Sequence, residues 1–228
     1  MAVPRPGEVR LRPAVPAPGM TRAFWVSFAA FLAFVAALIP NSDLTQAGAA
    51  WRFTLMGLAA GIAWWGAVER FEALPDRSRP WIFWGVAVVL RVLLLAACPA
   101  DDFWRYLWEG RIQSVGAGLN PYVFEPASPA LLPLRTAWWP LINHPDWASV
   151  YPPGAQWLFS RLALLTENPL GWKLLFAGFD LAVVAVLVRL RRGADRYRTV
   201  AWYAWNPLVL YAFAGAGHYD LSLIHISE

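Results

Sequence analysis

"WGVAVVLRVLLLAACPADDFWRYLWEGRIQ", residues 84–113, joins a long apolar run directly to a segment that begins with two carboxylates. The first part carries a single charged residue, Arg91, and is apolar enough to lie in a bilayer. The second part opens with Asp101 and Asp102 and then mixes charged with aromatic residues. The stretch therefore predicts a membrane span whose end brings ionisable groups to the water boundary.

The composition of the whole chain supports a membrane protein. Of the 228 residues 58% are hydrophobic and 15% are charged, 15 are Trp, and the mean hydropathy is +0.41. A single soluble domain cannot bury that much apolar surface. Of the 19 basic residues 18 are Arg, and we interpret the net charge of +4 as a topology signal, not as a nucleic-acid footprint. The one cysteine, Cys98, excludes an internal disulfide and a Cys-based zinc site.

Five apolar runs are long enough to cross about 30 Å of hydrocarbon as helices. The predicted spans are residues 23–39, 53–68, 81–97, 172–188 and 200–217. A sixth run, 155–165, is short and contains Arg161, so we interpret it as an interfacial or re-entrant helix. We therefore expect an all-α membrane protein, namely a polytopic helical bundle with an external amphipathic helix and a long outer loop.

Arginine placement predicts which side each loop occupies, because basic residues collect in cytoplasmic loops. With five spans, the tail 1–22 and the loops 69–80 and 189–198 are cytoplasmic, and segment 98–171 is external. The tail is rich in Pro and Arg and is expected to be flexible. Residues 221–228, "LSLIHISE", look like a translated sequencing adapter, so we expect a truncated sequence whose natural form continues differently.

Residues 101–115 separate into two faces when they are wound as a helix. The apolar face holds Phe103, Trp104, Leu107, Trp108, Ile112 and Val115, and the polar face holds Asp102, Arg105, Tyr106, Glu109 and Gln113. This pattern predicts an amphipathic helix along the membrane surface. Asp101 fits helix capping as well as catalysis, whereas Asp102 lies in the polar stripe and is the better candidate for a general base. Burial would raise the pKa of that carboxyl, and Arg105 would lower it.

Four segments in order carry a family resemblance: "DDFWRYLWEGRIQSVGAGLNPYVFEP", "VYPPGAQWLF", "WKLLFAGFDL" and "YAWNPLVLYAFAGAGHYD". Over about residues 85–220 the chain resembles the GT-C superfamily of polytopic glycosyltransferases, in particular glycosyltransferase family 87 and the polyprenol-phosphate-mannose-dependent mannosyltransferases. The resemblance implies inverting transfer of a hexose, with mannose the favoured sugar, from a polyprenyl-phosphate carrier to a glycan or lipid-linked acceptor outside the cytoplasm. It also implies an acidic base in an early outer loop, which Asp102 matches through the Asp-x-x-Arg spacing to Arg105, with Asp101 as an alternative.

A departing lipid phosphate needs charge stabilisation, which arginine supplies. Arg105 is the first candidate for this contact and Arg111 the second, although Arg111 also fits a side chain that reaches the lipid headgroups. The remaining candidates for substrate binding are Glu109, His218 and Asp220. Dependence on a divalent metal stays undecided, because Asp101, Asp102 and Glu109 are oxygen ligands. The loop Asn143–Asp146 has one His and one Asp and falls short of a metal-ligand set.

Two ionisable residues lie in the middle of predicted spans, Arg91 in the third and Asp180 in the fourth. Because an uncompensated charge in the bilayer is costly, we expect both to face the protein interior and to pair as structural residues. The alternative function rests on the same two residues as the substrate or proton site of a transporter or flippase subunit. A noncatalytic scaffold is a third reading. Asn206-Pro207 predicts a kink in the fifth span.

Overall fold

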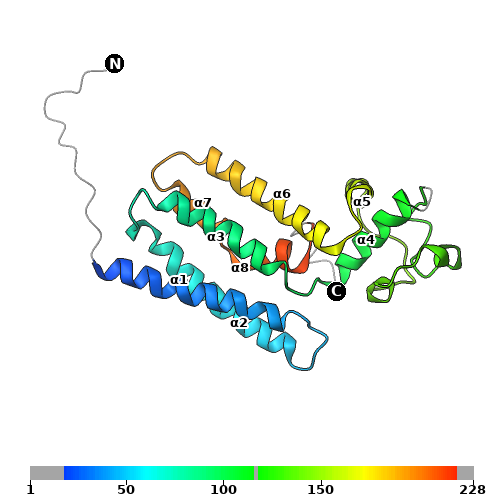
Figure 1. Ribbon diagram of the computed structural model, residues 1–228, viewed down its shortest axis with the longest axis horizontal. Helices are drawn as coiled ribbons and strands as arrows, with labels where there is room; N and C mark the ends of the chain where they lie inside the picture. Colours follow the sequence, from blue (N-terminus) through cyan, green and yellow to red (C-terminus); the bar gives the residue numbers. More distant parts are fainter. Residues whose placement is uncertain (1–17, 116–117, 220–228) are drawn as a thin grey trace, which may run out of the picture.

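The computed structural model describes residues 18–115 and 118–219, and within these ranges the chain forms helices and no strand. The predicted all-α class is therefore confirmed. The α-helices are α1 (Pro18–Leu38), α2 (Ala49–Glu69), α3 (Arg79–Leu94), α4 (Asp101–Ser114), α5 (Pro153–Leu165), α6 (Pro169–Leu190), α7 (Arg196–Ala204) and α8 (Pro207–Leu210). Figure 1 shows α1, α2, α3 and α6 as the long elements of an elongated bundle, with α4 and α5 at one end of it.

Short helical turns complete the description. Four are 3-10 turns, and the last element, η5, is a π-helix. Their bounds are η1 (Ile39–Asn41), η2 (Phe71–Ala73), η3 (Pro129–Leu134), η4 (Trp139–Leu141) and η5 (Tyr211–Ala216). The long connection between α4 and α5 contains η3 and η4, and the part of it that the structure describes has no longer helix.

Two sequence expectations about helix bounds are corrected by the structure. The predicted flexible tail, 1–22, overlaps α1, which the structure describes from Pro18 onward. The predicted span 200–217 is not one helix, since α7 ends at Ala204 and α8 starts at Pro207. The side chain of Asn206 accepts a hydrogen bond from the Leu208 amide over 2.9 Å and caps the new helix.

The bundle has two chemically different ends. At the first, which we call the arginine end, Thr21 Oγ1 donates to the carbonyl of Ala73 over 3.2 Å, and Arg198 pairs with Glu69 over 3.0 Å. The described arginines of the predicted cytoplasmic tail and loops are found here: Arg22, Arg70, Arg77, Arg79, Arg189, Arg191, Arg192, Arg196 and Arg198.

The opposite end, which we call the α4 end, is tied together by backbone contacts. The amide of Cys98 donates to Ser42 Oγ over 2.7 Å, and the amide of Ala100 donates to the carbonyl of Ala216 over 2.9 Å. The α1–α2 turn, the segment after α3 and the end of η5 therefore meet next to the first residue of α4. The fold places Asp101, Asp102 and the 217–219 segment at this same end.

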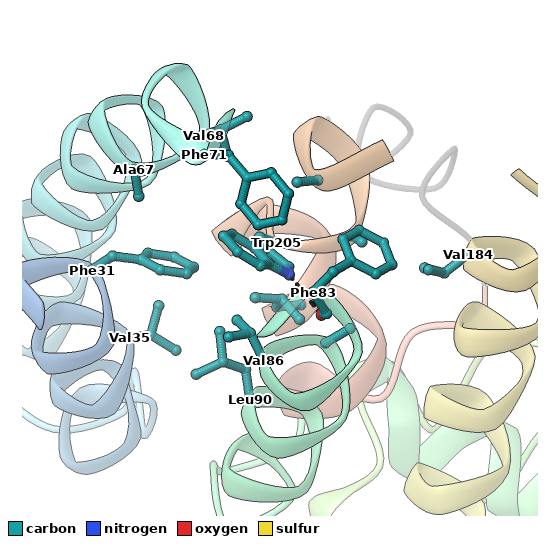
Figure 2. Packing of buried hydrophobic residues seen from close by; sticks show 14 of the residues in the cluster. Phe31, Val35, Ala67, Val68, Phe71, Phe83, Val86, Leu90, Val184 and Trp205 are labelled. Carbon is teal, nitrogen blue, oxygen red and sulfur yellow. Dashed lines mark hydrogen bonds between the residues drawn. The ribbon is translucent and has the colours of Figure 1, made fainter. Parts of the chain in front are cut away.

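The centre of the bundle is aromatic. Trp205, in the break between α7 and α8, is fully buried, and Figure 2 shows its ring between Phe71 and Phe83. The Phe71 and Trp205 rings meet edge to face with centroids 5.3 Å apart, and the Trp205 indole N–H donates to the carbonyl of Phe83 over 3.1 Å. The break at Asn206 thus places a large side chain where several helices converge.

The outer surface of the bundle carries many large apolar side chains. By length and composition, one helix within the described residues is long and apolar enough to cross a membrane, over Gly19–Asn41. Elsewhere α2, α3 and α6 each expose a series of such side chains, including Leu58, Ile62, Trp65, Val89, Val92, Phe179, Val183 and Val186. Water-soluble monomers rarely expose contiguous apolar surface of this kind.

Helices α4 and α5 pack closely against each other at their end of the bundle. A Cβ atom on Gly110 would lie 2.6 Å from the carbonyl oxygen of Phe159, so glycine allows the two backbones to approach. Phe103, Tyr106, Phe159 and Trp172 belong to the apolar cluster between α4, α5 and the start of α6. A second cluster joins α4 to the long connection through Trp108, Ile112, Leu131 and Ile142.

Candidate functional site

The candidate site lies at the first turn of α4. Asp101 is exposed, and its Oδ1 accepts a hydrogen bond from the amide of Asp102 over 3.0 Å, which suits a carboxylate at a helix N-terminus. Asp102 is half-buried, and its Oδ1 accepts two hydrogen bonds, from Asn143 Nδ2 over 2.7 Å and from the Tyr151 hydroxyl over 3.2 Å. Of the two predicted base candidates, the structure holds Asp102 in place and leaves Asp101 at the surface.

An aromatic wall adjoins Asp102. The rings of Tyr106 and Tyr151 meet edge to face with centroids 5.1 Å apart. Burial, followed by the charges of Tyr106 and Asp102, raises the pKa of Tyr151, so its hydroxyl keeps its proton and remains a donor to the carboxylate. The Tyr106 hydroxyl lies 3.3 Å from Nδ1 of His218. His218 is therefore connected to the candidate base Asp102 through the two neighbouring tyrosines, Tyr106 and Tyr151.

Glycine is required where the C-terminal segment meets α4. Gly217 has a φ of +77°, and a Cβ atom there would lie 2.5 Å from the ring of Phe103. This close approach fixes His218 beside α4. Asp220, the neighbouring candidate, lies outside the described residues.

The predicted exposed polar face of α4 is wrong for three of its members, Arg105, Tyr106 and Glu109. All three are buried, with 4%, 0% and 1% of their surface exposed. Segment 143–156 covers them, and periodicity within α4 cannot detect a cover that lies about 40 residues further along the chain.

Four of the five N–H donors of Arg105 have partners inside the protein. Its Nε donates to Glu109 Oε1 over 2.8 Å. Its terminal nitrogens donate to the carbonyls of Asn143, at 3.3 Å, and His144, at 2.7 Å, and to the carbonyl of Trp147. An arginine that is buried and makes four such bonds holds the turn of the chain around it, and its donors are not directed at an incoming phosphate.

Glu109 forms the other half of this buried network. Its Oε2 accepts hydrogen bonds from Ser149 Oγ over 2.8 Å and from Gln156, whose own Oε1 accepts from Gln113 over 2.7 Å. Burial raises the pKa of Glu109, and the neighbouring Arg105 opposes that shift. Glu109 therefore holds segment 143–156 against α4, and its buried carboxylate is not placed to contact a substrate.

Arg111, the second predicted phosphate contact, bridges two elements instead. Its Nε donates to the carbonyl of Leu134 over 3.0 Å, and its NH1 group pairs with Glu167, which lies just before α6.

The three carboxylates considered as metal ligands, those of Asp101, Asp102 and Glu109, do not form one site. The carboxylate of Glu109 already binds Arg105, Ser149 and Gln156 in the protein interior. In residues 18–115 and 118–219 no three His, Cys, Asp or Glu side chains gather as a metal site.

The structure places Arg91 and Asp180 together in the interior of the bundle. Arg91 Nε and NH2 lie 2.7 Å and 2.5 Å from Asp180 Oδ2, and Tyr203 donates to Asp180 Oδ1 over 2.7 Å. Arg91 NH1 also donates to the carbonyls of Ala87 and Ala204. Each is about 1% exposed, so the pair closes on itself and its immediate neighbours.

Three contributors were missed by sequence reasoning. Asn143 and Tyr151 bind Asp102 from positions 41 and 49 residues away, and neither forms a pattern with α4. Lys173 is buried at the start of α6, and its Nζ donates to the carbonyls of Leu95 and Ala97, just past the end of α3. The available signal was a single lysine at the edge of an apolar run. Its ammonium group binds carbonyls just past the C-terminus of α3, where a cation is favoured.

No protein-family profile, curated protein or solved structure matches this chain. The functional argument therefore rests on the residues themselves.

Proposed function

We propose that this chain is the membrane-embedded part of a glycosyltransferase that moves a hexose from a polyprenyl-phosphate carrier to an acceptor outside the cytoplasm. The reaction inverts the anomeric carbon, mannose is the first sugar to test, and Asp102 is the general base. The donor is the lipid-phosphate sugar, and the acceptor is a glycan or a lipid-linked glycan.

The location in a membrane is supported by the surface and the two ends of the bundle. Exposed apolar side chains run along α2, α3 and α6, as they do on helices that face lipid. The described arginines of the predicted cytoplasmic segments lie at the arginine end, and Asp102 lies at the other. By the positive-inside tendency, several helices cross the membrane and the α4 end faces away from the cytoplasm.

The single observation that carries the catalytic proposal is the environment of Asp102. Asn143 and Tyr151 both donate to Oδ1, so the carboxylate is fixed by two contacts on one oxygen and Oδ2 is assigned to the reacting proton. A general base must be held within hydrogen-bond reach of the proton that it takes. Asp102 meets this need at a half-buried position at the membrane boundary.

The proposed step is a direct displacement. The carboxylate of Asp102 takes the proton of an acceptor hydroxyl, the oxygen attacks the anomeric carbon, and the bond to the carrier phosphate breaks. The electron pair leaves with the polyprenyl phosphate. We assign His218, joined to the site through Tyr106, to the departing phosphate, because Arg105 and Arg111 are committed to protein partners.

The test is sugar transfer in membranes that contain the expressed protein, supplied with radiolabelled polyprenyl-phosphate mannose and an acceptor extract. Asp102→Asn is expected to lower the rate by about 10²-fold or more, the usual contribution of a general base. Asp101→Asn is the matched control and is expected to keep the rate. Because the sequence is expected to be truncated, both variants are made in the uninterrupted gene. Full activity of Asp102→Asn contradicts the proposal.

A further inference from the structure

We propose that the turn Asn143–Trp147 is a sugar-binding subsite, in which the exposed ring of Trp147, stacked on the ring of His144, receives the face of a pyranose near Asp102. The inference rests on the proposed function for its choice of ligand. It assigns substrate binding to a segment that the sequence offered only as an inadequate metal site.

The turn is built around one buried cation. Arg105 donates to the carbonyls of Asn143, His144 and Trp147, and the Trp147 amide donates to the His144 carbonyl over 3.1 Å. Glu109 holds the guanidinium from the opposite side. A five-residue loop is thereby fixed at three of its carbonyls.

His144 is held in an unfavourable backbone conformation. Its φ is +42°, and it is the one residue other than glycine with a positive φ among those that the structure describes. Such a conformation persists only where the surroundings impose it, and it is found preferentially at functional sites. Here the imposing group is Arg105, which binds the carbonyl of the strained residue over 2.7 Å.

This conformation gives the turn a stacked pair of aromatic rings. The His144 and Trp147 rings are stacked, with centroids 4.8 Å apart and an angle of 21° between their planes. Both side chains are exposed, Trp147 by 62%. A pyranose ring has an apolar face of C–H groups that packs on aromatic rings, while its hydroxyls need acceptors. The exposed carboxylate of Asp146, between the two rings in sequence, supplies acceptors.

The same turn reaches the candidate base. The side chain of Asn143, one residue before His144, donates to Asp102 Oδ1 over 2.7 Å. The proposed subsite is therefore connected to the candidate base through Asn143.

The experiment follows the indole N–H signals of the ¹⁵N-Trp-labelled chain in lipid nanodiscs during titration with methyl α-D-mannopyranoside. The Trp147 signal, assigned by its loss in Trp147→Phe, is expected to shift to saturation. Trp157, 63% exposed on α5, is the matched control and is expected to stay in place. His144→Gly keeps a residue that tolerates the positive φ and removes one ring, and it is expected to weaken binding about tenfold.

Two results overturn the subsite: no saturable shift at Trp147, or the same shift with glycerol at equal concentration. Broadening of the Trp147 signal by a lipid-soluble spin label but not by a water-soluble one also overturns it, because Trp147 is then an interfacial anchor. Asp102→Asn is expected to keep the shift. The proposed catalytic role of Asp102 and the proposed sugar subsite can therefore be disproved independently.

Discussion

Nε of Arg91 lies 2.7 Å from Oδ2 of Asp180, which joins α3 to α6 in the interior of the bundle. Tyr203 adds the connection to α7 through the other carboxylate oxygen. The buried pair and Tyr203 tie α3, α6 and α7 together, and this favours a structural role over the transport alternative.

The first prediction concerns this pair. Asp180→Leu leaves the Arg91 charge buried without its carboxylate and is expected to lower the free energy of unfolding by about 3 to 5 kcal/mol. Adding Arg91→Met is expected to restore most of the loss, because a buried ion pair replaced as a unit by apolar side chains is often neutral. Denaturant unfolding in mixed micelles completes the double-mutant cycle, and additive losses would contradict the structural role.

The second prediction concerns Glu109 and pH. Because burial raises the folded-state pKa of Glu109 above its ordinary 4.5, the folded protein binds its proton more tightly than the unfolded chain. The contribution of Glu109 to stability is therefore complete below about pH 4.5 and is lost as pH rises through the folded pKa. The difference in thermal midpoint between the wild type and Glu109→Gln, measured from pH 4 to 8, is expected to change in favour of the variant as pH rises. A pH-independent difference would show that Glu109 does not titrate differently on folding.

A third prediction separates arginine from lysine at position 105. Lysine has one point charge and cannot bind Glu109 and three carbonyls in the planar geometry of a guanidinium. Arg105→Lys is expected to cost about 2 to 4 kcal/mol in the free energy of unfolding and to open segment 143–149 to proteolysis. Arg161→Lys on the exposed face of α5 is the control and is expected to leave both measurements unchanged. Equal protease resistance of the two variants would remove Arg105 as the support of the turn.

The fourth prediction uses two glycines. Gly217→Ala adds a methyl group 2.5 Å from the ring of Phe103 at a φ of +77°, and it is expected to destabilise the fold by about 2 to 4 kcal/mol. Gly178→Ala lies in α6 with open space around its Cβ and is expected to be neutral or to stabilise by about 0.5 to 1 kcal/mol. Comparable thermal midpoints for the two variants would contradict the close contact between η5 and α4.

The sequence predicts the long helices of the bundle from the length of their apolar runs. The run 53–68 lies within α2, which begins four residues earlier and ends one residue later, and the run 172–188 lies within α6, which begins three residues earlier and ends two residues later. The break at Asn206-Pro207 also had a local cause, since proline removes a backbone donor. The π-helix that follows, and its close approach to Phe103, had no such signal.

The candidate site was predictable only in its local part. Asp102 could be named because a carboxylate at the end of an apolar run is unusual in a chain of this composition. The roles of Arg105 and Glu109 were misjudged, because the helical period assigns a face but does not say what covers it. That information lay in Asn143, Ser149 and Gln156, whose contacts with α4 appear only after the chain has folded back.

Cys98 is exposed at the α4 end, where its amide is anchored to Ser42. As the one thiol of the chain, it is a built-in reporter of sidedness: a membrane-impermeant maleimide added to intact cells would modify the unaltered protein at this residue and nowhere else. Burial raises the pKa of the thiol, so the modification should be slow at neutral pH and faster in mildly alkaline buffer.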